Sequence, residues 1–285
     1  MANSFPVSQA IGGALGLLEA NSVLGKRVHR DSEKHFGGGT GATVQVRIPK
    51  TISATNGMGQ NTVYTDINES TVPVEITAEA YSAVALTDQE MALNVIDFGK
   101  QVLQPQASGV AKFCEQAIAG VMNTAVTDST LEISPTNPLG AFVRAAAEFT
   151  RREIDLPGRT MAIGPDVLEV LLALPALQDV AASGGGDVLE GGFLTKLLGF
   201  DIVVSPYVSG AVAFTPEGFA LATRAPGVPE GAGYAATETH NGWSMRYLQD
   251  FDITRRAEVS LMSVFVGATL LDERRVMAFS LPSGV

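Results

Sequence analysis

The chain has 285 residues, of which 46% are hydrophobic and only 17% are charged, and it carries a net charge of −11. This length suffices for one large domain or two smaller ones, and the charged fraction, low against about 25% in typical soluble domains, predicts that apolar surface is covered in an oligomer. The acidic balance argues against a protein that grips nucleic acid through phosphate contacts, because such binding needs clustered Lys and Arg.

Residues 1–42 are interpreted as an N-terminal arm that ends in a hinge. The first 18 residues carry no charged side chain, but they are too polar to span a bilayer and lack the basic segment of a signal peptide. A loose helical stripe follows, and then a small basic cluster made of Lys26, Arg27 and Arg30. This cluster either contacts a neighbouring molecule or is the solvated end of a helix. Because glycine breaks helices, the expected hinge residues are Gly37, Gly38, Gly39 and Gly41.

Residues 43–80 are predicted to form a long β-hairpin that extends from the body. Val44, Val46 and Ile48 alternate with polar residues, which is the period of a strand with one buried face. A glycine-containing tip follows, and the chain then returns in a second alternating run. The hairpin has too few large apolar side chains for a core of its own, so we expect it to pack on a partner or to stay mobile. Its candidates for contact with a neighbouring subunit are Arg47, Lys50 and Tyr64.

The segment 81–125 is predicted to contain the longest helix, from about Thr87 to Ala125. A hydroxyl residue followed three positions later by Glu90 matches a capping box at its start. We expect the helix to pause near Pro105 and to resume as an apolar stripe at helical spacing. The single cysteine, Cys114, lies on this stripe, where a buried structural thiol is expected. One cysteine also excludes an intrachain disulfide and a cysteine-based zinc site.

Residues 126–239 combine helix and strand signals and are interpreted as a separate α/β unit, and residues 240–285 as strands that return to the long helix. In the first unit, the predicted elements are a helix after Pro138, a strand at 159–163, a helix from Pro165 and a strand at 200–204. Two more strands, at 211–214 and 219–223, are predicted to pair as a hairpin across Pro216, Glu217 and Gly218. The predicted C-terminal strands are 243–251, 259–266 and 276–281.

The sequence contains no recognisable catalytic or cofactor motif. His29 and His35 are six residues apart without a zinc-binding pattern. The glycines before residue 42 follow a charged segment and precede a strand, and they lack the Gly-Lys-Ser/Thr that opens a helix in a phosphate-binding loop. No Gly-x-Ser-x-Gly element follows a strand. Asp250 and Asp252 share a strand face, where we expect them to be solvated or paired with Arg246. We therefore expect no enzyme, no cofactor and no metal.

The chain resembles a known family over essentially its whole length, and the resemblance is clearest in three segments. The first joins the arm to the hairpin, the second is a buried strand, and the third is the closing pair of strands. They are Leu17 to Leu24 with Val28 to Asp31 and Gly41 to Pro49; Gly199 to Pro206; and Met245, Arg246 and Gln249 to Ile253 with Val264 to Gly267. In these the chain resembles the major capsid proteins of tailed bacteriophages, although Ala42 stands where an acidic residue is common in that family.

The resemblance implies an α+β fold of the Hong Kong 97 type, with an N-terminal arm, an extended hairpin loop, a peripheral domain with a long spine helix, and an axial domain. It assigns 1–42 to the arm and hinge, 43–80 to the loop, 81–125 and 240–285 to the peripheral domain, and 126–239 to the axial domain. Lys50 is the only hairpin lysine for a crosslink of the kind that some family members form.

The family also implies partners: copies of the chain in pentamers and hexamers, a scaffolding protein, a portal and decoration proteins. The implied product is an icosahedral shell in the virion, assembled in the host cytoplasm, that encloses double-stranded DNA without sequence-specific binding and without a membrane. Two alternatives stay open. The first is an encapsulin-like nanocompartment with the same fold, and the second is a soluble oligomeric α/β enzyme.

Overall fold

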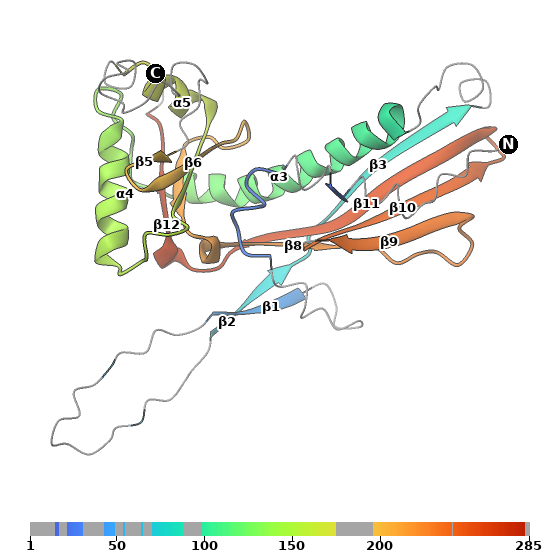
Figure 1. Cartoon of the computed structure of the whole chain (residues 1–285), viewed down its shortest axis with the longest axis horizontal. Coiled ribbons are helices and arrows are strands. Elements are labelled where there is room, and N and C mark those ends of the chain that lie inside the picture. Colours follow the sequence, from blue (N-terminus) through green and yellow to red (C-terminus); the bar gives the residue numbers. More distant parts are fainter. Residues whose placement is uncertain are drawn as a thin grey trace.

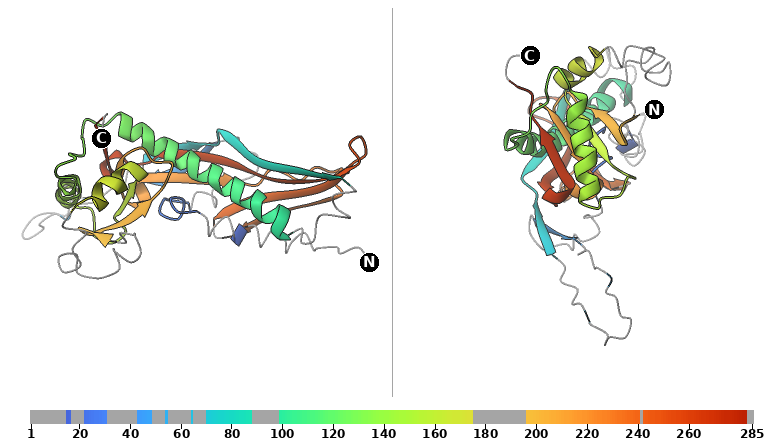
Figure 2. Two further views of the ribbon diagram at one scale, coloured as in Figure 1. Left: turned by 90° about the horizontal axis from the view of Figure 1, so that it is seen from above. Right: turned by 90° about the vertical axis from the view of Figure 1, so that its left-hand side faces the viewer.

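The computed structural model describes residues 15–16, 22–30, 43–48, 54, 64, 70–87, 99–174, 196–240 and 242–282. These residues form an elongated body with helix α4 at one end and the tips of strands β10 and β11 at the other (Figure 1). Two sheets share this body. We call them the long sheet and the short sheet, and helix α3 runs past both (Figure 2).

The long sheet is antiparallel and has the strand order β3-β11-β10-β9, with β8 also paired to β11. Its strands are β3 (Ala78–Thr87), β8 (Phe219–Arg224), β9 (Tyr234–His240), β10 (Trp243–Asp252) and β11 (Ala257–Leu270). Helix α3 (Gln104–Thr127) packs on this sheet and buries Val110, Cys114 and Ile118. The buried Gln106 amide donates to the carbonyls of Ser82 at 3.1 Å and Ser260 at 2.9 Å, which ties the start of the helix to β3 and β11.

Thr87 is the last residue of β3 and pairs with Ala257. The capping box predicted at Thr87 stays a prediction, because the residues that it would cap are not described. Residues 88–98 lie outside the described part of the chain. A π-helical turn, Gly99–Leu103, leads into α3, and Pro105 lies in its first turn. Proline fits the first turn of this helix because its φ is already helical.

The short sheet has the order β12-β7-β4-β6-β5, in which only β4 and β6 are parallel. Its strands are β4 (Thr160–Ile163), β5 (Lys196–Leu197), β6 (Phe200–Val204), β7 (Ala211–Phe214) and β12 (Val276–Phe279). One face, including Met161 and Ile163, packs on helices α4 (Leu139–Arg151) and α5 (Pro165–Leu172). The opposite face, with Ala162, packs in the cluster that contains the second half of α3. The short sheet is therefore covered on both faces.

The predicted pairing of 211–214 with 219–223 is wrong. β7 pairs with β4 and β12, whereas β8 pairs with β11 in the other sheet. A 3-10 turn, Pro216–Gly218, carries the chain from one sheet to the other. Phe214 and Phe219, on either side of this turn, make an edge-to-face contact at 5.5 Å and are fully buried. Both strands are buried on both faces, so their partners are decided by tertiary packing and not by the turn between them.

The predicted hairpin strands do pair: β1 (Thr43–Ile48) runs antiparallel to β2 (Ser70–Glu75). This ribbon stands out from the side of the body (Figures 1 and 2). Its root is held by the same chain, because Val44, Val46 and Val74 are buried in a small cluster with Ala220, Ala222 and Leu271. The hairpin is thus a projection with a fixed base.

Candidate assembly surfaces

The base of the hairpin presses directly on β11. A Cβ atom at Gly267 would lie 2.2 Å from the carbonyl oxygen of Glu75 and 3.0 Å from the Cα of Ile76. The backbone N–H of Thr77 donates to the carbonyl of Val266 at 3.2 Å, so the chain is bonded to β11 as it passes from β2 to β3. Only glycine leaves room for this approach, and Gly267 was not among the predicted functional residues.

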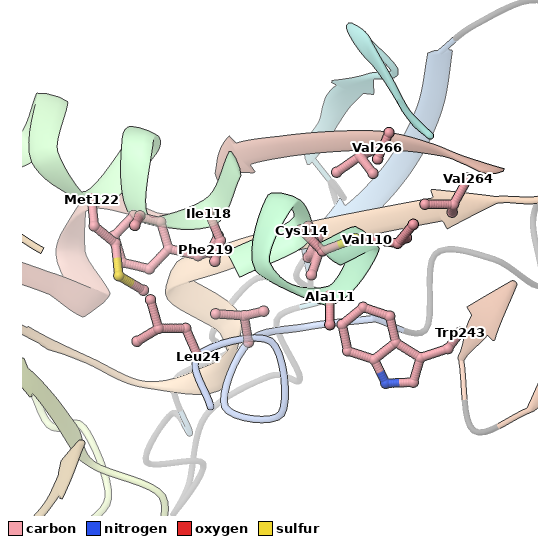
Figure 3. Close-up of a cluster of buried hydrophobic side chains, with 14 of the residues drawn as sticks. Leu24, Val110, Ala111, Cys114, Ile118, Met122, Phe219, Trp243, Val264 and Val266 are labelled. Carbon is pink, nitrogen blue, oxygen red and sulfur yellow. The ribbon is translucent and has the colours of Figure 1, made fainter. Parts of the chain in front are cut away.

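A segment of the arm, residues 22–30, docks on the same subunit, and we call it the strap. Leu24 and Val28 are buried in the core cluster beneath α3, where Figure 3 shows Leu24 near Met122 and Phe219. The carboxylate of Glu115, on α3, accepts hydrogen bonds from the backbone N–H groups of Val23 at 2.9 Å, Leu24 at 2.9 Å and Gly25 at 3.1 Å. The Ser22 hydroxyl donates to the same carboxylate.

The strap also reaches the short sheet. Arg27 Nη1 lies 2.9 Å from Asp201 Oδ2 on β6, and Lys196 Nζ lies 3.7 Å from the other carboxylate oxygen. The His29 N–H donates to the carbonyls of Pro216 and Phe219, at the turn between the sheets. Segment 22–30 therefore contacts the long helix, the junction of the sheets and the short sheet.

The predicted interface residues fall into three groups. Arg27 pairs with Asp201 and the Arg30 guanidinium lies 4.9 Å from the centre of the Trp243 ring, so both contact their own chain. The side chains of Lys26, Arg47 and Tyr64 are exposed. Lys50 and the hinge candidates Gly37, Gly38, Gly39 and Gly41 lie outside the described residues. The six interface candidates stay predictions as contacts with a neighbour, and the four glycines stay predictions as a hinge.

Exposed apolar side chains gather at the outer end of the long sheet. Tyr234, Phe251 and Ile253 are 65%, 50% and 81% exposed, and we call them the distal patch. Tyr234 pairs with Gln249, two residues before Phe251, so the two aromatic rings are diagonal neighbours on one face of the sheet. Aromatic side chains exposed together at the end of a rigid sheet are typical of a protein contact.

Charged groups near this patch have local partners. Asp252 Oδ1 accepts from the N–H of Thr254 at 2.8 Å, and its Oδ2 lies 3.7 Å from Arg255. Two outcomes were expected for Asp250: solvation, or a pair with Arg246. Asp250 is exposed, which confirms the first. The other, a pair with Arg246, is wrong, because Arg246 lies 3.8 Å from Glu79 and donates to the Ser263 hydroxyl and the Gly227 carbonyl.

The described residues include no group of three or more His, Cys, Asp or Glu side chains placed to bind a metal ion. A hollow of about 410 Å³ between α3 and β11 is lined by residues such as Phe113, Ala117 and Ala268, none of which titrates. A second, of about 270 Å³, holds Glu153, Asp155 and Glu217, but Arg275 already pairs with Glu217 at 2.8 Å. The first hollow therefore contains no acid or base, and in the second the Thr215 hydroxyl donates to the same Glu217 carboxylate at 3.4 Å.

Cys114 is fully buried, as predicted. Burial, and secondarily the charge of Glu115, raises the pKa of its thiol from 9.0 to about 12.

We expect Cys114 in the folded subunit to resist a thiol reagent at about pH 8 and to react once the subunit is unfolded, because the thiolate is the reactive form. Since the folded state holds this proton more tightly, the associated stability is complete below pH 9.0 and is lost as the pH rises through about 12. Rapid labelling of the folded subunit would contradict this description.

No helix among the described residues is long and apolar enough to cross a membrane.

Comparison with known proteins gives a consistent result. A family model described as phage capsid protein matches residues 71–274. The chain matches none of the curated protein sequences. Its fold is similar to a solved chain from Mycobacterium phage Che8, at 16% identity over 90% of this chain and 89% of that one, with a TM-score of 0.63.

Two further solved structures have a similar fold. The capsid of cyanophage P-SCSP1u is 14% identical over 85% of this chain and 84% of that chain, with a TM-score of 0.60. A virus-like particle from Pyrococcus furiosus is 12% identical over 93% and 95% of the two chains, with a TM-score of 0.53. At identities of 12–16%, the structural likeness establishes the fold alone. The family model matches the amino-acid sequence itself, over residues 71–274.

Proposed function

The chain belongs to the phage capsid protein family and is a structural major capsid protein of a tailed bacteriophage, and from this premise we propose which of its surfaces join copies into the head shell. The hairpin, the arm and the distal patch each contact a neighbouring subunit. The axial domain, residues 126–239, faces its copies around five-fold and six-fold axes. The subunit acts as a building block and catalyses no reaction.

The observation that carries this proposal is the projecting ribbon with a fixed base. β1 and β2 stand outside the body, yet Val44, Val46 and Val74 fix their root on β8 and Gly267 fixes the following turn on β11. A ribbon that is aimed by its own subunit, and exposes Gln45 and Arg47 along β1, is suited to lie across a neighbour. Contacts between different surfaces of successive copies close into rings and shells when the rotation is right.

Many modest contacts suffice for such a shell, because each subunit is held by several neighbours at once. The net charge of −11 fits a container for DNA that does not hold its contents tightly. Assembly in the host cytoplasm, with a scaffolding protein, a portal and decoration proteins as partners, completes the proposal. The hinge at Gly37 to Gly41 remains part of it, as the point at which arm and hairpin change direction relative to each other.

The distal patch gives a specific expectation. Replacing Phe251 and Ile253 with serine should leave the stability of the isolated subunit within about 0.5 kcal/mol of wild type, because both side chains are already exposed. Assembly should weaken markedly, since aromatic anchors carry a large share of interface energy. Sedimentation of dilute particles measures this. Equal assembly by the variant and the wild type would show that the distal patch is not a contact between subunits.

A cryo-electron microscopy reconstruction of particles formed by the chain tests the proposed function. We expect an icosahedral shell that contains both pentamers and hexamers, with β1 and β2 of each subunit lying on a neighbour. The contents then separate the two kinds of container: a packaged genome marks a phage head, and an enclosed enzyme marks a nanocompartment. A discrete small oligomer with a ligand-binding cavity would overturn both.

A further inference from the structure

We propose that the strap, residues 22–30, is a conformational latch that sets the angle between the long and short sheets. Glu115 is its permanent anchor, and the Arg27–Asp201 ion pair is its releasable end. The proposal rests on the proposed shell function, in which one chain must fit into rings of five and of six. It is carried by three features of the strap: the buried anchor, the close contact with Trp243 and the exposed ion pair.

The anchor is the buried carboxylate of Glu115, which accepts four hydrogen bonds from the strap. Glu115 is 5% exposed and Ser22 is 2% exposed. Three consecutive backbone N–H groups and one hydroxyl converge on the two carboxylate oxygens. Hydrogen bonds to an ionised acceptor are stronger than neutral ones, and a buried carboxylate that loses its donors is costly. This end of the strap should therefore stay closed.

The strap also packs tightly against the long sheet at Gly25. A Cβ atom there would lie 2.8 Å from Cη2 of the Trp243 indole and 2.5 Å from the Ser22 hydroxyl oxygen. Arg30 covers the same ring, and Figure 3 shows Ala111 of α3 facing it from the helix side. Trp243 is the only tryptophan of the chain, so its fluorescence reports whether the strap is seated.

The other end is built to release. The side chains of Arg27 and Asp201 are 43% and 29% exposed, and ion pairs at such positions are weak and screened by salt. When Arg27 leaves, Asp201 keeps a second cation, because Lys196 lies 3.7 Å from its other oxygen. The open state thus leaves no carboxylate without a nearby positive charge.

The strap crosses the place where the sheets are joined. The His29 N–H donates to Pro216 at 2.9 Å and to Phe219 at 3.0 Å, and the Leu221 N–H donates to the His29 carbonyl at 3.0 Å. These bonds hold the strap on the 3-10 turn through which the chain passes from β7 to β8. Opening the ion pair would free the short sheet to turn about this junction while the strap stays attached to α3, as in a hinge.

Hydrogen exchange on the unassembled subunit tests both ends. Glu115→Gln should speed exchange of the Val23, Leu24 and Gly25 amides by about 10-fold or more and make Trp243 more accessible to acrylamide, because local opening governs both. Gly25→Ala should act in the same direction from the strap side.

Arg27→Gln and Asp201→Asn, which test the releasable end, should leave the amides of residues 23–25 protected but speed exchange at His29 and Leu221. The double variant should add little to either single change.

Arg151→Gln is the matched control, since it removes an exposed ion pair to Glu148 within α4 and should change none of these readouts. Unchanged exchange at residues 23–25 in Glu115→Gln and Gly25→Ala would overturn the anchor. Exchange at His29 and Leu221 equal to that of the control would overturn the latch. In shells, the latch variants should broaden the distribution of diameters, whereas a wild-type chain that forms no shells would refute the proposed function and leave the subunit results standing.

Discussion

Replacing Gly267 with valine should abolish shell assembly while leaving both sheets folded. The new Cβ would meet the carbonyl oxygen of Glu75 at 2.2 Å, and a backbone atom cannot move aside as a side-chain tip can. Valine itself favours strands, so strand propensity adds no penalty to this clash. Overpacking of this kind costs about 1–3 kcal/mol, and the chain can relieve it by lifting the root of the hairpin off β11. A ribbon that leaves its subunit at another angle no longer meets its neighbour.

Gly231→Val is the matched control, because nothing lies within 4 Å of a Cβ at that position. Circular dichroism and urea unfolding of the dissociated subunit establish that each variant is folded, and light scattering establishes whether it assembles. We expect the control to form particles and Gly267→Val to remain as free subunits or open fragments. Normal particles from Gly267→Val would show that the direction of the hairpin root does not control assembly.

Replacing Phe219 with alanine should cost the isolated subunit about 3–5 kcal/mol in the free energy of unfolding, as is usual for a fully buried phenylalanine. Phe219 is fully buried in the core cluster with α3 and contacts Phe214 across the turn between the sheets. The loss would be a large part of a total stability of about 5–15 kcal/mol, and it would loosen both sheets together.

The same substitution at Phe251, which is 50% exposed, serves as the control and should change subunit stability by less than about 0.5 kcal/mol. Urea titrations of the dissociated subunits measure both values. A Phe219→Ala subunit as stable as Phe251→Ala would mean that the crossover does not hold the two sheets together.

Strong local patterns predicted much of the fold. The alternation of Val44, Val46 and Ile48 predicted β1, and the C-terminal strand pattern predicted β10, β11 and β12. Helical spacing predicted the burial of Cys114 and Ile118, although Phe113 on the same stripe is 38% exposed. These elements each have one buried face or a continuous apolar run, which is where sequence patterns are most informative.

Tertiary contacts decided the rest. β3 is rich in small residues, with Ala80, Ala83 and Ala85 in its sequence, and it is a strand because β11 supplies ten residues of pairing. β7 and β8 looked like a hairpin because turn residues separate them, but each pairs with a strand distant in sequence.

Two parts of the candidate site have a signal in the sequence. Glu115 lies four residues after Ala111 and three before Ile118, on the buried stripe of α3, and a carboxylate at such a position needs donors from another segment. Gly267 interrupts an otherwise continuous strand pattern, which often marks a close backbone approach. Neither pattern names its partner, because the strap and Glu75 are brought there by the fold.

Size-exclusion chromatography with light scattering, followed by negative-stain electron microscopy of the chain expressed alone, tests most directly that it is a shell subunit. We expect closed shells, tubes or rings of five or six subunits. A dimer or tetramer that never assembles further, even with a scaffolding protein present, would contradict the central claim.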